Sequence, residues 1–440
     1  MGEHIVEAEH GLVGRIAAFV SRHGAFITVT TLFLAWGFIT SNNDPLIASL
    51  KASFSLTYTE ALMTQLVFFA AYGFMSLPAA SLINHAGPVK SILIALATMV
   101  TGCLLVQFVT RFQSYELILA ALFVLGIGIT TLQVAANPLA AALGPPESSH
   151  FRLTFAQAFN SLGVVLGVNF GSKIMLGEDV LKSGHAPITD PAEKILALNG
   201  VTHAFLLIAI LLAALMVFIW VSRKRIEAAA AAITSTENGS VLAALRSRWA
   251  IFGAIAIGLY VGAEVSIGSI MINFLNQPDV LNLPLETAGF YLGNIYWMGA
   301  LVGRFIGSYL LTRMAAPLLL AAAATIASLL CLTVGLTSGP VAAYAALAVG
   351  LFNSIMFPTI FTITLERAGV SQSSTSGLLC VAIVGGAILP YAVGKFADNV
   401  SLSLSFFVPM AAYAVIVAFA VLAAKARVFH ADGAAPTAVH

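Results

Sequence analysis

Charged side chains are scarce in this sequence of 440 residues. Asp, Glu, Lys and Arg together account for 9% of the chain, whereas soluble domains carry roughly 25%. Hydrophobic residues account for 59%. So few charges cannot cover the surface of a water-soluble fold, and most of the chain must therefore be solvated by lipid. The formal net charge of +1 provides no basic surface for nucleic acid, which is not an expected partner.

Several chemical signatures are also missing. The three cysteines, Cys103, Cys331 and Cys380, lie far apart inside apolar runs, which predicts buried thiols and no metal site. No glycine-rich loop is followed by Lys and then Ser or Thr, so a nucleotide site and direct pumping by ATP are disfavoured. No catalytic constellation occurs either, so the sequence predicts neither an enzyme nor a protein with a bound cofactor.

Long apolar runs fill the chain instead. A bilayer core needs roughly 20 apolar residues per helix, so the runs predict an all-α membrane protein with twelve transmembrane helices. Turn-like pairs such as Gly-Pro separate them. The predicted helices span residues 26–50, 60–84, 89–110, 114–143, 150–176, 200–222, 249–276, 285–314, 315–337, 339–367, 372–398 and 401–425.

The positions of Lys and Arg predict the orientation. If the N-terminus is cytoplasmic, fourteen of the 20 Lys and Arg residues fall on the inside, which favours cytoplasmic termini in a bacterial inner membrane. A polar stretch between the sixth and seventh helices reads as a linker. The predicted organisation is a cytoplasmic N-terminal segment (1–25), a six-helix bundle (26–222), a cytoplasmic linker (223–248), a second six-helix bundle (249–425) and a cytoplasmic tail (426–440).

A weak internal repeat supports two pseudo-symmetric halves. Pro358 follows Pro138 by 220 positions, and at the same offset Glu264 in the seventh helix corresponds to Asp44 in the first. Two halves related in this way, with a site between them near the bilayer midplane, are typical of secondary transporters. The sequence therefore predicts a carrier for a small polar solute that works by alternating access.

Two acids lie where lipid is expected. A charge at the centre of a membrane helix costs at least roughly 2.5 kcal/mol, so Asp44 and Glu264 are expected to line a cavity. Pro45 removes a backbone donor and weakens the first helix beside Asp44. A carboxyl group held in a dry cavity can bind and release a proton near neutral pH, and both acids are therefore candidates for coupling to a cation.

Amides inside the helices form a second group of candidates. Side-chain amides donate and accept hydrogen bonds, as sugar hydroxyls do, although amides also join membrane helices to each other. Aromatic rings can stack on the apolar face of a hexose. The candidate substrate-binding residues are Asn43, Gln133, Asn137, Gln157, Asn160, Tyr260, Asn294, Trp297 and Asn353.

Charges at the inner helix ends are candidates for a cytoplasmic gate. We expect Glu147, Arg304, Glu366 and Arg367 to form ion pairs that hold an outward-open state. The opposing interpretation is that these side chains are ordinary solvated loop charges.

Six stretches resemble one known family. They are NDPLI (43–47), LQVAANP (132–138), AQAFNSLG (156–163), YVGAEVSIG (260–268), FNSIMFP (352–358) and SGLL (376–379). Together they are similar to the bacterial L-fucose permease and glucose/galactose transporter family, and the fourth resembles the glucose/galactose branch. The resemblance implies a major facilitator fold and cation-coupled uptake of a hexose or deoxyhexose.

The resemblance also implies residue roles. The fucose permease carries its coupling proton on the aspartate that corresponds to Asp44. At the position of Gln133 that permease has a glutamate, so Glu264 is the candidate for a second acid here. We expect a proton-coupled symporter, with coupling to sodium and export of a small amphiphile by proton exchange as alternatives. A sugar and the bilayer are the expected partners, the monomer is the expected functional unit, and no metal site is expected.

Overall fold

A computed structural model describes residues 24–54, 56, 58–175, 191–234 and 241–428. Within these ranges every regular element is a helix and no β-strand occurs. Eleven of the described segments are long and apolar enough to cross a bilayer. The prediction of an all-α, multi-pass membrane protein is confirmed.

The first group of helices, which we call the N-bundle, covers residues 24–234. Its first helix spans residues 24–41 and continues after a break as α2 (Asn43–Phe54). The next helices are α3 (Tyr58–Ala86), α4 (Pro88–Val109), α5 (Tyr115–Ala142), α6 (Ser149–Met175) and α8 (Pro191–Thr234). Helix α8 continues into the segment 223–248 that the sequence predicts as a linker.

The second group, the C-bundle, covers residues 248–424. Its helices are α9 (Arg248–Asn276), α10 (Leu285–Tyr291), α11 (Met298–Leu310), α12 (Ala316–Leu336), α13 (Gly339–Asn353), α14 (Met356–Arg367), α15 (Gln372–Val381), α16 (Gly385–Asn399) and α17 (Phe407–Ala424). A π-helical turn, Leu292–Trp297, joins α10 to α11. This composite helix carries Asn294 and Arg304. It corresponds to the predicted transmembrane helix 285–314, which is the one predicted helix without a counterpart among the eleven long apolar segments of the described ranges.

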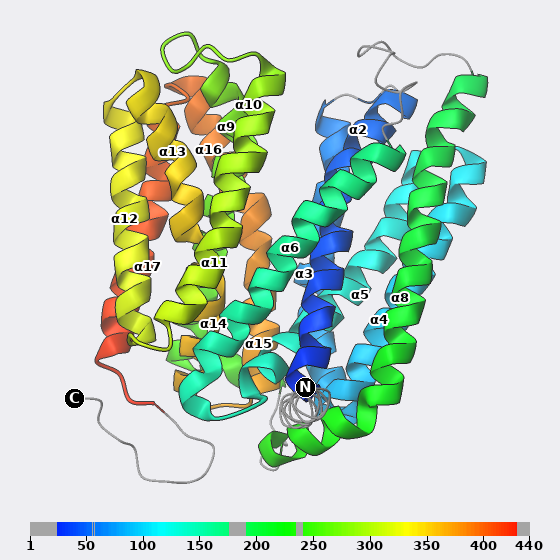
Figure 1. The fold of residues 1–440 in the computed structure, drawn as a ribbon, viewed down its shortest axis with the longest axis vertical. Helices are drawn as coiled ribbons and strands as arrows, with labels where there is room; N and C mark the ends of the chain where they lie inside the picture. The colour runs from blue at the N-terminus through cyan, green and yellow to red at the C-terminus, as the bar shows by residue number, and fades with distance from the viewer. Residues whose placement is uncertain (1–23, 55, 57, 176–190, 235–240, 429–440) are drawn as a thin grey trace, which may run out of the picture.

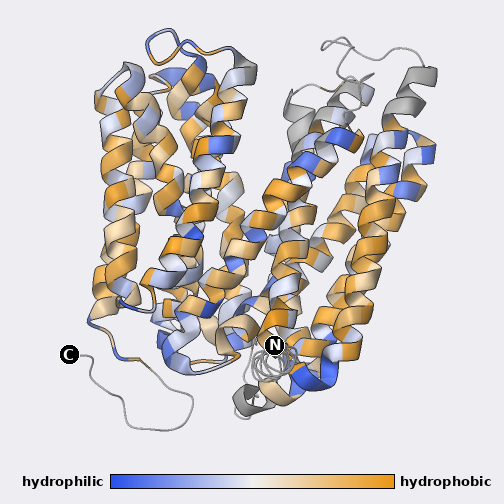
Figure 2. Ribbon diagram, in the orientation of Figure 1, coloured by the Kyte–Doolittle hydropathy of each residue, from blue (hydrophilic) through white to orange (hydrophobic). Residues whose placement is uncertain are grey.

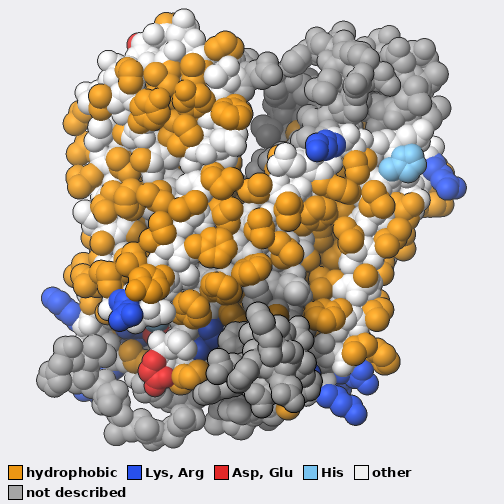
Figure 3. Space-filling model, viewed as in Figure 1, with side chains coloured by type: hydrophobic (Ala, Val, Ile, Leu, Met, Phe, Trp, Pro, Cys, Tyr) orange, Lys and Arg blue, Asp and Glu red, His pale blue; other side chains and the backbone are white. Residues whose placement is uncertain are grey.

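The two bundles stand side by side with their helices roughly parallel (Figure 1). We call the end that holds residue 24 and Ala424 the lower end, and the opposite end the upper end. Hydrophobic residues cover the middle of the bundles, while polar residues gather toward the ends (Figure 2). On the visible face, apolar side chains form a broad band, and most Lys, Arg, Asp and Glu side chains lie near the lower end (Figure 3). This distribution suits a bilayer around the band.

The bundles are joined through the lower half of the molecule. Ser376 on α15 donates to the backbone oxygen of Val134 on α5 (2.8 Å). Ser373 on α15 donates to Asn84 on α3. Helix α6 packs against both α11 and α14 of the other bundle. These contacts close the lower end in this conformation.

Glycines bring α6 close to the first helix. A Cβ atom at Gly163 would overlap the backbone oxygen of Leu34, and one at Gly167 would overlap the backbone oxygen of Phe38. Such small residues allow membrane helices to pack with their backbones in contact. This close contact fixes the position of α6 relative to the first helix, and with it the separation of the side chains on the two helices.

We expect Gly163→Ala to lower the thermal stability of the purified protein, because the added methyl group must push two helices apart. Overpacking of this kind costs about 1–3 kcal/mol. Gly394→Ala is the matched control, since a Cβ atom at Gly394 in α16 meets nothing within 4 Å. Equal unfolding temperatures for the two variants would show that the α6 contact is not tight.

Candidate functional site

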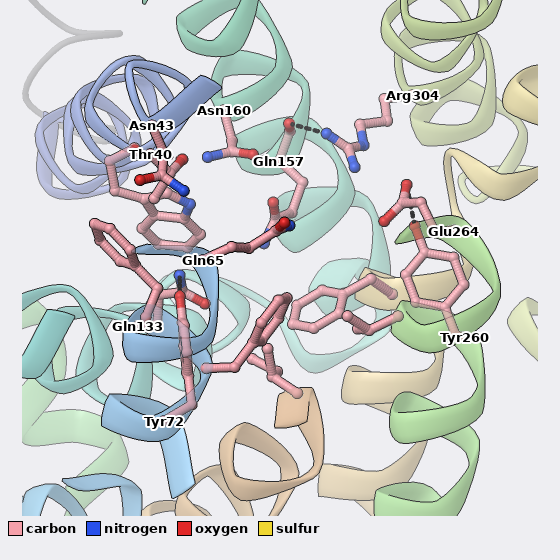
Figure 4. A pocket seen from close by; sticks show the side chains of 16 residues that line it. Thr40, Asn43, Gln65, Tyr72, Gln133, Gln157, Asn160, Tyr260, Glu264 and Arg304 are labelled. Atoms are coloured by element: carbon pink, nitrogen blue, oxygen red, sulfur yellow. Dashed lines mark hydrogen bonds between the residues drawn. The ribbon is translucent and has the colours of Figure 1, made fainter. Parts of the chain in front are cut away.

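A cavity of about 320 Å³ lies between the two bundles. That volume is at the lower end of the range typical of small-molecule sites. Both bundles contribute to its wall (Figure 4). The lining residues are Trp36, Thr40, Asn43, Gln65, Phe68, Phe69, Tyr72, Gln133, Gln157 and Asn160 from the N-bundle, and Tyr260, Val261, Glu264, Arg304, Phe357 and Ile383 from the C-bundle.

Four of the predicted amides line the N-bundle wall. The side-chain nitrogen of Gln133 donates to the hydroxyl of Tyr72, and that of Asn160 donates to the backbone oxygen of Phe33 (3.2 Å). Gln157 donates to the side-chain oxygen of Asn137 (3.4 Å). Each bond uses one of the two N–H groups of the amide, which leaves the second N–H to donate to a solute hydroxyl and the amide oxygen to accept from one.

The fourth amide, Asn43, lies at the break in the first helix. Pro45 has no backbone N–H, so the carbonyl of Ser41 lacks its helical donor. The side chain of Asn42 bridges the break by donating to the backbone oxygen of Phe38 (2.5 Å). The helix restarts as α2 with Asn43 against the cavity. Asp44 is the next residue of α2, and its side chain lies outside the part of the chain that the structure describes.

Helix α3 supplies a face of the cavity that the motif analysis does not identify. Gln65, Phe68, Phe69 and Tyr72 all line it. They are spaced as i, i+3, i+4 and i+7, which places them on one side of a helix. The sequence does contain a signal for this face. A polar residue is followed by three aromatic residues at helical spacing within an apolar run.

The C-bundle wall carries two opposite charges. The hydroxyl of Tyr260 donates to Glu264 Oε1 (2.8 Å), one helical turn away on α9. Arg304 on α11 lines the same cavity and interacts electrostatically with the Glu264 carboxylate. Figure 4 shows the guanidinium and the carboxylate on the same side of the cavity. Tyr260 also packs against Phe357, with ring centroids 6.4 Å apart.

Arg304 lies in the cavity, whereas the sequence predicts it at the cytoplasmic gate. Its Nη1 donates to the backbone oxygen of Gln157 (3.2 Å) and to the hydroxyl of Ser161, both on α6. Its Nε donates to the backbone oxygen of Ser354 in its own bundle (3.1 Å). One guanidinium therefore joins the two bundles beside the candidate acid. Arg304 is not a loop charge at a helix end, because it lies inside α11.

The other predicted gate residues lie at the lower end. Glu147 is exposed. Glu366 and Arg367 form an ion pair within α14 (3.2 Å). Glu366 also reaches α6 of the N-bundle, where it accepts from Ser149 (2.9 Å) and contacts His150 (3.1 Å).

Four predicted binding residues lie outside the cavity lining. Asn137 is fully buried between helices and orients Gln157. Asn353 is fully buried and donates to Tyr296 (3.1 Å). Trp297 packs edge-on against Tyr296, with centroids 5.0 Å apart. Asn294 is exposed and donates to the backbone of its own helix (3.0 Å). Asn137 and Asn353 therefore form hydrogen bonds between helices, which is the alternative interpretation that the sequence leaves open for buried amides.

Among the described residues no group of three or more His, Cys, Asp and Glu side chains is placed to hold a metal ion. The cavity instead combines neutral hydrogen-bonding groups, aromatic rings and one pair of opposite charges. Such a lining suits a small polyhydroxylated solute better than a metal or a nucleotide.

Comparisons with known proteins agree with this architecture. Residues 25–379 match the Major Facilitator Superfamily. The chain is 40% identical to a glucose/galactose transporter of Brucella abortus over 91% of its length and 94% of that protein. It is 30% identical to the L-fucose-proton symporter of Escherichia coli, over 90% of its length and 92% of that protein.

A solved structure has the same fold. The structure of a Major Facilitator Superfamily transporter, FucP, in the outward conformation superposes with a TM-score of 0.79 at 26% identity, and covers 92% of this chain and 99% of that one. The predicted family and fold are therefore confirmed, as is the expectation that the protein is not an enzyme. The chain belongs to the Major Facilitator Superfamily of membrane transporters.

Proposed function

We propose that this protein is a proton-coupled symporter that imports a hexose or deoxyhexose by alternating access. The observation that carries the proposal is the cavity between the bundles, where amides of the N-bundle face a carboxylate and a guanidinium of the C-bundle. These side chains include hydrogen-bond donors and hydrogen-bond acceptors, and a sugar hydroxyl can bond to either. The aromatic rings of Trp36, Phe68 and Tyr260 offer faces for the apolar side of the ring.

Relatives support the choice of solute and of ion. A glucose/galactose transporter is similar to this chain at 40% identity, and an L-fucose-proton symporter at 30%. We assign coupling to Asp44, at the break in the first helix, and to Glu264 in the C-bundle wall of the cavity. A carboxyl group that is neutral in one state and ionised in the other can move a proton as the bundles rock.

We place the lower end in the cytoplasm and the protein in a bacterial inner membrane, where it acts as a monomer. The excess of Lys and Arg on the predicted inner side supports this orientation. With the lower end closed by contacts between the bundles, the conformation corresponds to an outward-facing state. Inward opening then requires α6 to separate from α11 and α14.

Counterflow in proteoliposomes tests the proposal. Vesicles loaded with unlabelled glucose, galactose or fucose are diluted into a trace of the labelled sugar, and a carrier must accumulate the label transiently by exchange. A channel or a sugar sensor does not. Absence of counterflow for every hexose and deoxyhexose tested, in protein shown to be folded, would contradict the proposal.

For the binding site, Gln157→Ala and Asn160→Ala are each expected to weaken sugar binding about tenfold, the effect of one or two hydrogen bonds. Isothermal titration calorimetry measures the change. Asn294→Ala is the matched control, because Asn294 is an amide in the same protein that lies outside the cavity lining. Unchanged affinity in both cavity variants would remove α6 from the site.

A further inference from the structure

His150 joins the two bundles at the lower end. It lies near the start of α6, and both of its ring nitrogens contact α14 of the C-bundle. Nε2 is 3.1 Å from Glu366 Oε1, and Nδ1 is within hydrogen-bond distance of the hydroxyl of Thr362. Glu366 is one of the gate residues that the sequence predicts, whereas His150 and Thr362 belong neither to that set nor to the cavity lining.

The hydrogen bonds around Thr362 decide which atoms carry protons. The Thr362 hydroxyl lies 2.8 Å from the backbone oxygen of Pro358 and donates to it. A carbonyl oxygen can only accept, so this hydrogen bond uses the hydroxyl proton of Thr362. The single hydroxyl proton is thus committed to α14, and toward His150 the Thr362 oxygen can only accept. Nδ1 can donate to this oxygen only when it carries a proton.

The second nitrogen faces an acceptor as well. Glu366 forms an ion pair with Arg367, whose Nη1 donates to Oε2 of Glu366 (3.2 Å). Arg367 is itself fixed in the C-bundle, since its Nε donates to the backbone oxygen of Ala423 on α17 (3.1 Å). Ser149 donates to Glu366 as well (2.9 Å). An ionised carboxylate accepts only, so Nε2 can donate to Glu366 only when this nitrogen carries a proton.

Both contacts can be hydrogen bonds donated by His150 at the same time only when each ring nitrogen carries a proton, as in an imidazolium cation. We propose that protonated His150 latches the two bundles together at the lower end, and that loss of this proton releases the latch. A neutral imidazole has one N–H and must leave either Glu366 or Thr362 facing a lone pair. Histidine is the side chain whose charge ordinarily changes between about pH 5 and about pH 8, so the latch responds to the pH on the lower side.

Two other charged side chains near α6 have separate partners. Arg152 donates to the backbone oxygens of Ala141 and Pro145, and Arg304 is held by Ser354 and α6 in the cavity. Glu366 and Arg367 are the charged side chains on α14 that meet the latch. The remaining charged residues on elements packed against α6 are Glu147 on η2, Lys173 on α6, Glu116 on α5, Asp44 and Lys51 on α2, and Glu193, Lys194, Arg223, Lys224, Arg225 and Glu227 on α8.

The consequence for transport follows from the proposed orientation. If the lower end faces the cytoplasm, acidification of the cytoplasm stabilises the closed lower end and slows inward opening. A proton symporter delivers protons to that side, so the latch limits uptake as its own co-substrate accumulates. The latch itself rests on the alternating-access part of the proposed function and does not depend on the sugar, whereas the limit on uptake also requires the proposed proton coupling.

Distance measurements between spin labels test the latch without sugar. Labels at Pro146→Cys and Met314→Cys, both exposed near the lower end of opposite bundles, report its opening in the full-length protein, whose native cysteines are buried. Lowering the pH from about 8 to about 5.5 is expected to reduce the open population about tenfold, the effect of one charge-assisted hydrogen bond. In His150→Gln the open population is high and independent of pH.

His85→Gln is the matched control, because His85 is exposed and bonds only within its own helix, to Ser81 (2.7 Å). It should keep the pH response of the parent protein. An unchanged pH response in His150→Gln would overturn the proposal. Nitrogen-15 NMR of the imidazoles gives a second readout that needs no functional variant: the signal lost in His150→Gln must show two protonated nitrogens in the closed state, and a single protonated nitrogen there would equally overturn it.

Discussion

Asp44→Asn is expected to abolish uphill sugar uptake while leaving sugar exchange intact. Asparagine has nearly the size and shape of aspartate, so the break in the first helix and the position of Asn43 should persist. It cannot bind and release a proton, and a carrier without its coupling site only equilibrates the sugar. The accumulation ratio under an imposed proton gradient should therefore fall to its equilibrium value, whereas counterflow continues.

Asp398→Asn is the control for this variant. Asp398 is an exposed acid on α16 and is not one of the residues that line the cavity. It should accumulate sugar as the parent protein does. If Asp44→Asn still concentrates sugar against its gradient, the coupling assignment is wrong, whatever the identity of the sugar.

The second large effect is expected at the charge pair of the cavity. Arg304→Gln leaves the Glu264 carboxylate without its cationic neighbour and removes the hydrogen bonds to Gln157 and Ser161. Glu264→Gln leaves the guanidinium without its anion. A lone charge in such a setting is costly, so each single change should lower thermal stability and sugar binding strongly.

The double variant distinguishes a pair from two independent groups. In Glu264→Gln/Arg304→Gln the two losses should be less than additive by about 1 kcal/mol or more, as is usual for side chains in one network. Thermal unfolding of the four proteins in the same detergent gives this coupling energy. Additive losses would mean that Arg304 stabilises the α6 contact alone and has no role in the state of Glu264.

Much of the fold could be predicted because lipid imposes it. Apart from residues 200–222, which lie inside the longer α8 (Pro191–Thr234), each predicted helix in the described ranges coincides closely with an observed helix or pair of helices, as for residues 249–276 and α9 (Arg248–Asn276). Apolar length and Gly-Pro breaks determine these boundaries locally. The long reach of α8 to Thr234 was not predictable in this way, because beyond Arg223 the chain leaves the apolar run and only helix propensity remains.

The candidate site was harder to predict, since it depends on which helix faces meet. The pairs Gln157 and Asn160 on α6 and Tyr260 and Glu264 on α9 could be anticipated from helical spacing, and the structure places all four on the cavity. Burial alone does not separate a cavity amide from an interhelical one, so Asn353 could not be told from Gln157. That distinction requires the tertiary packing.

Histidine shows another limit of the sequence. His150 carries no formal charge in the count of Lys and Arg that predicts topology, and no local motif connects it to Glu366, which lies in the other half of the chain. Its position becomes informative only when α6 and α14 are brought together.

The central claim is that one cavity carries a sugar and a proton together, and proton movement driven by sugar tests it most directly. Purified protein is reconstituted in weakly buffered vesicles without sodium, and a hexose or deoxyhexose that supports counterflow is added outside. The account predicts that the external pH rises as protons enter with the sugar, and that Asp44→Asn abolishes the rise. Sugar entry without any pH change, or entry that requires sodium, would contradict it.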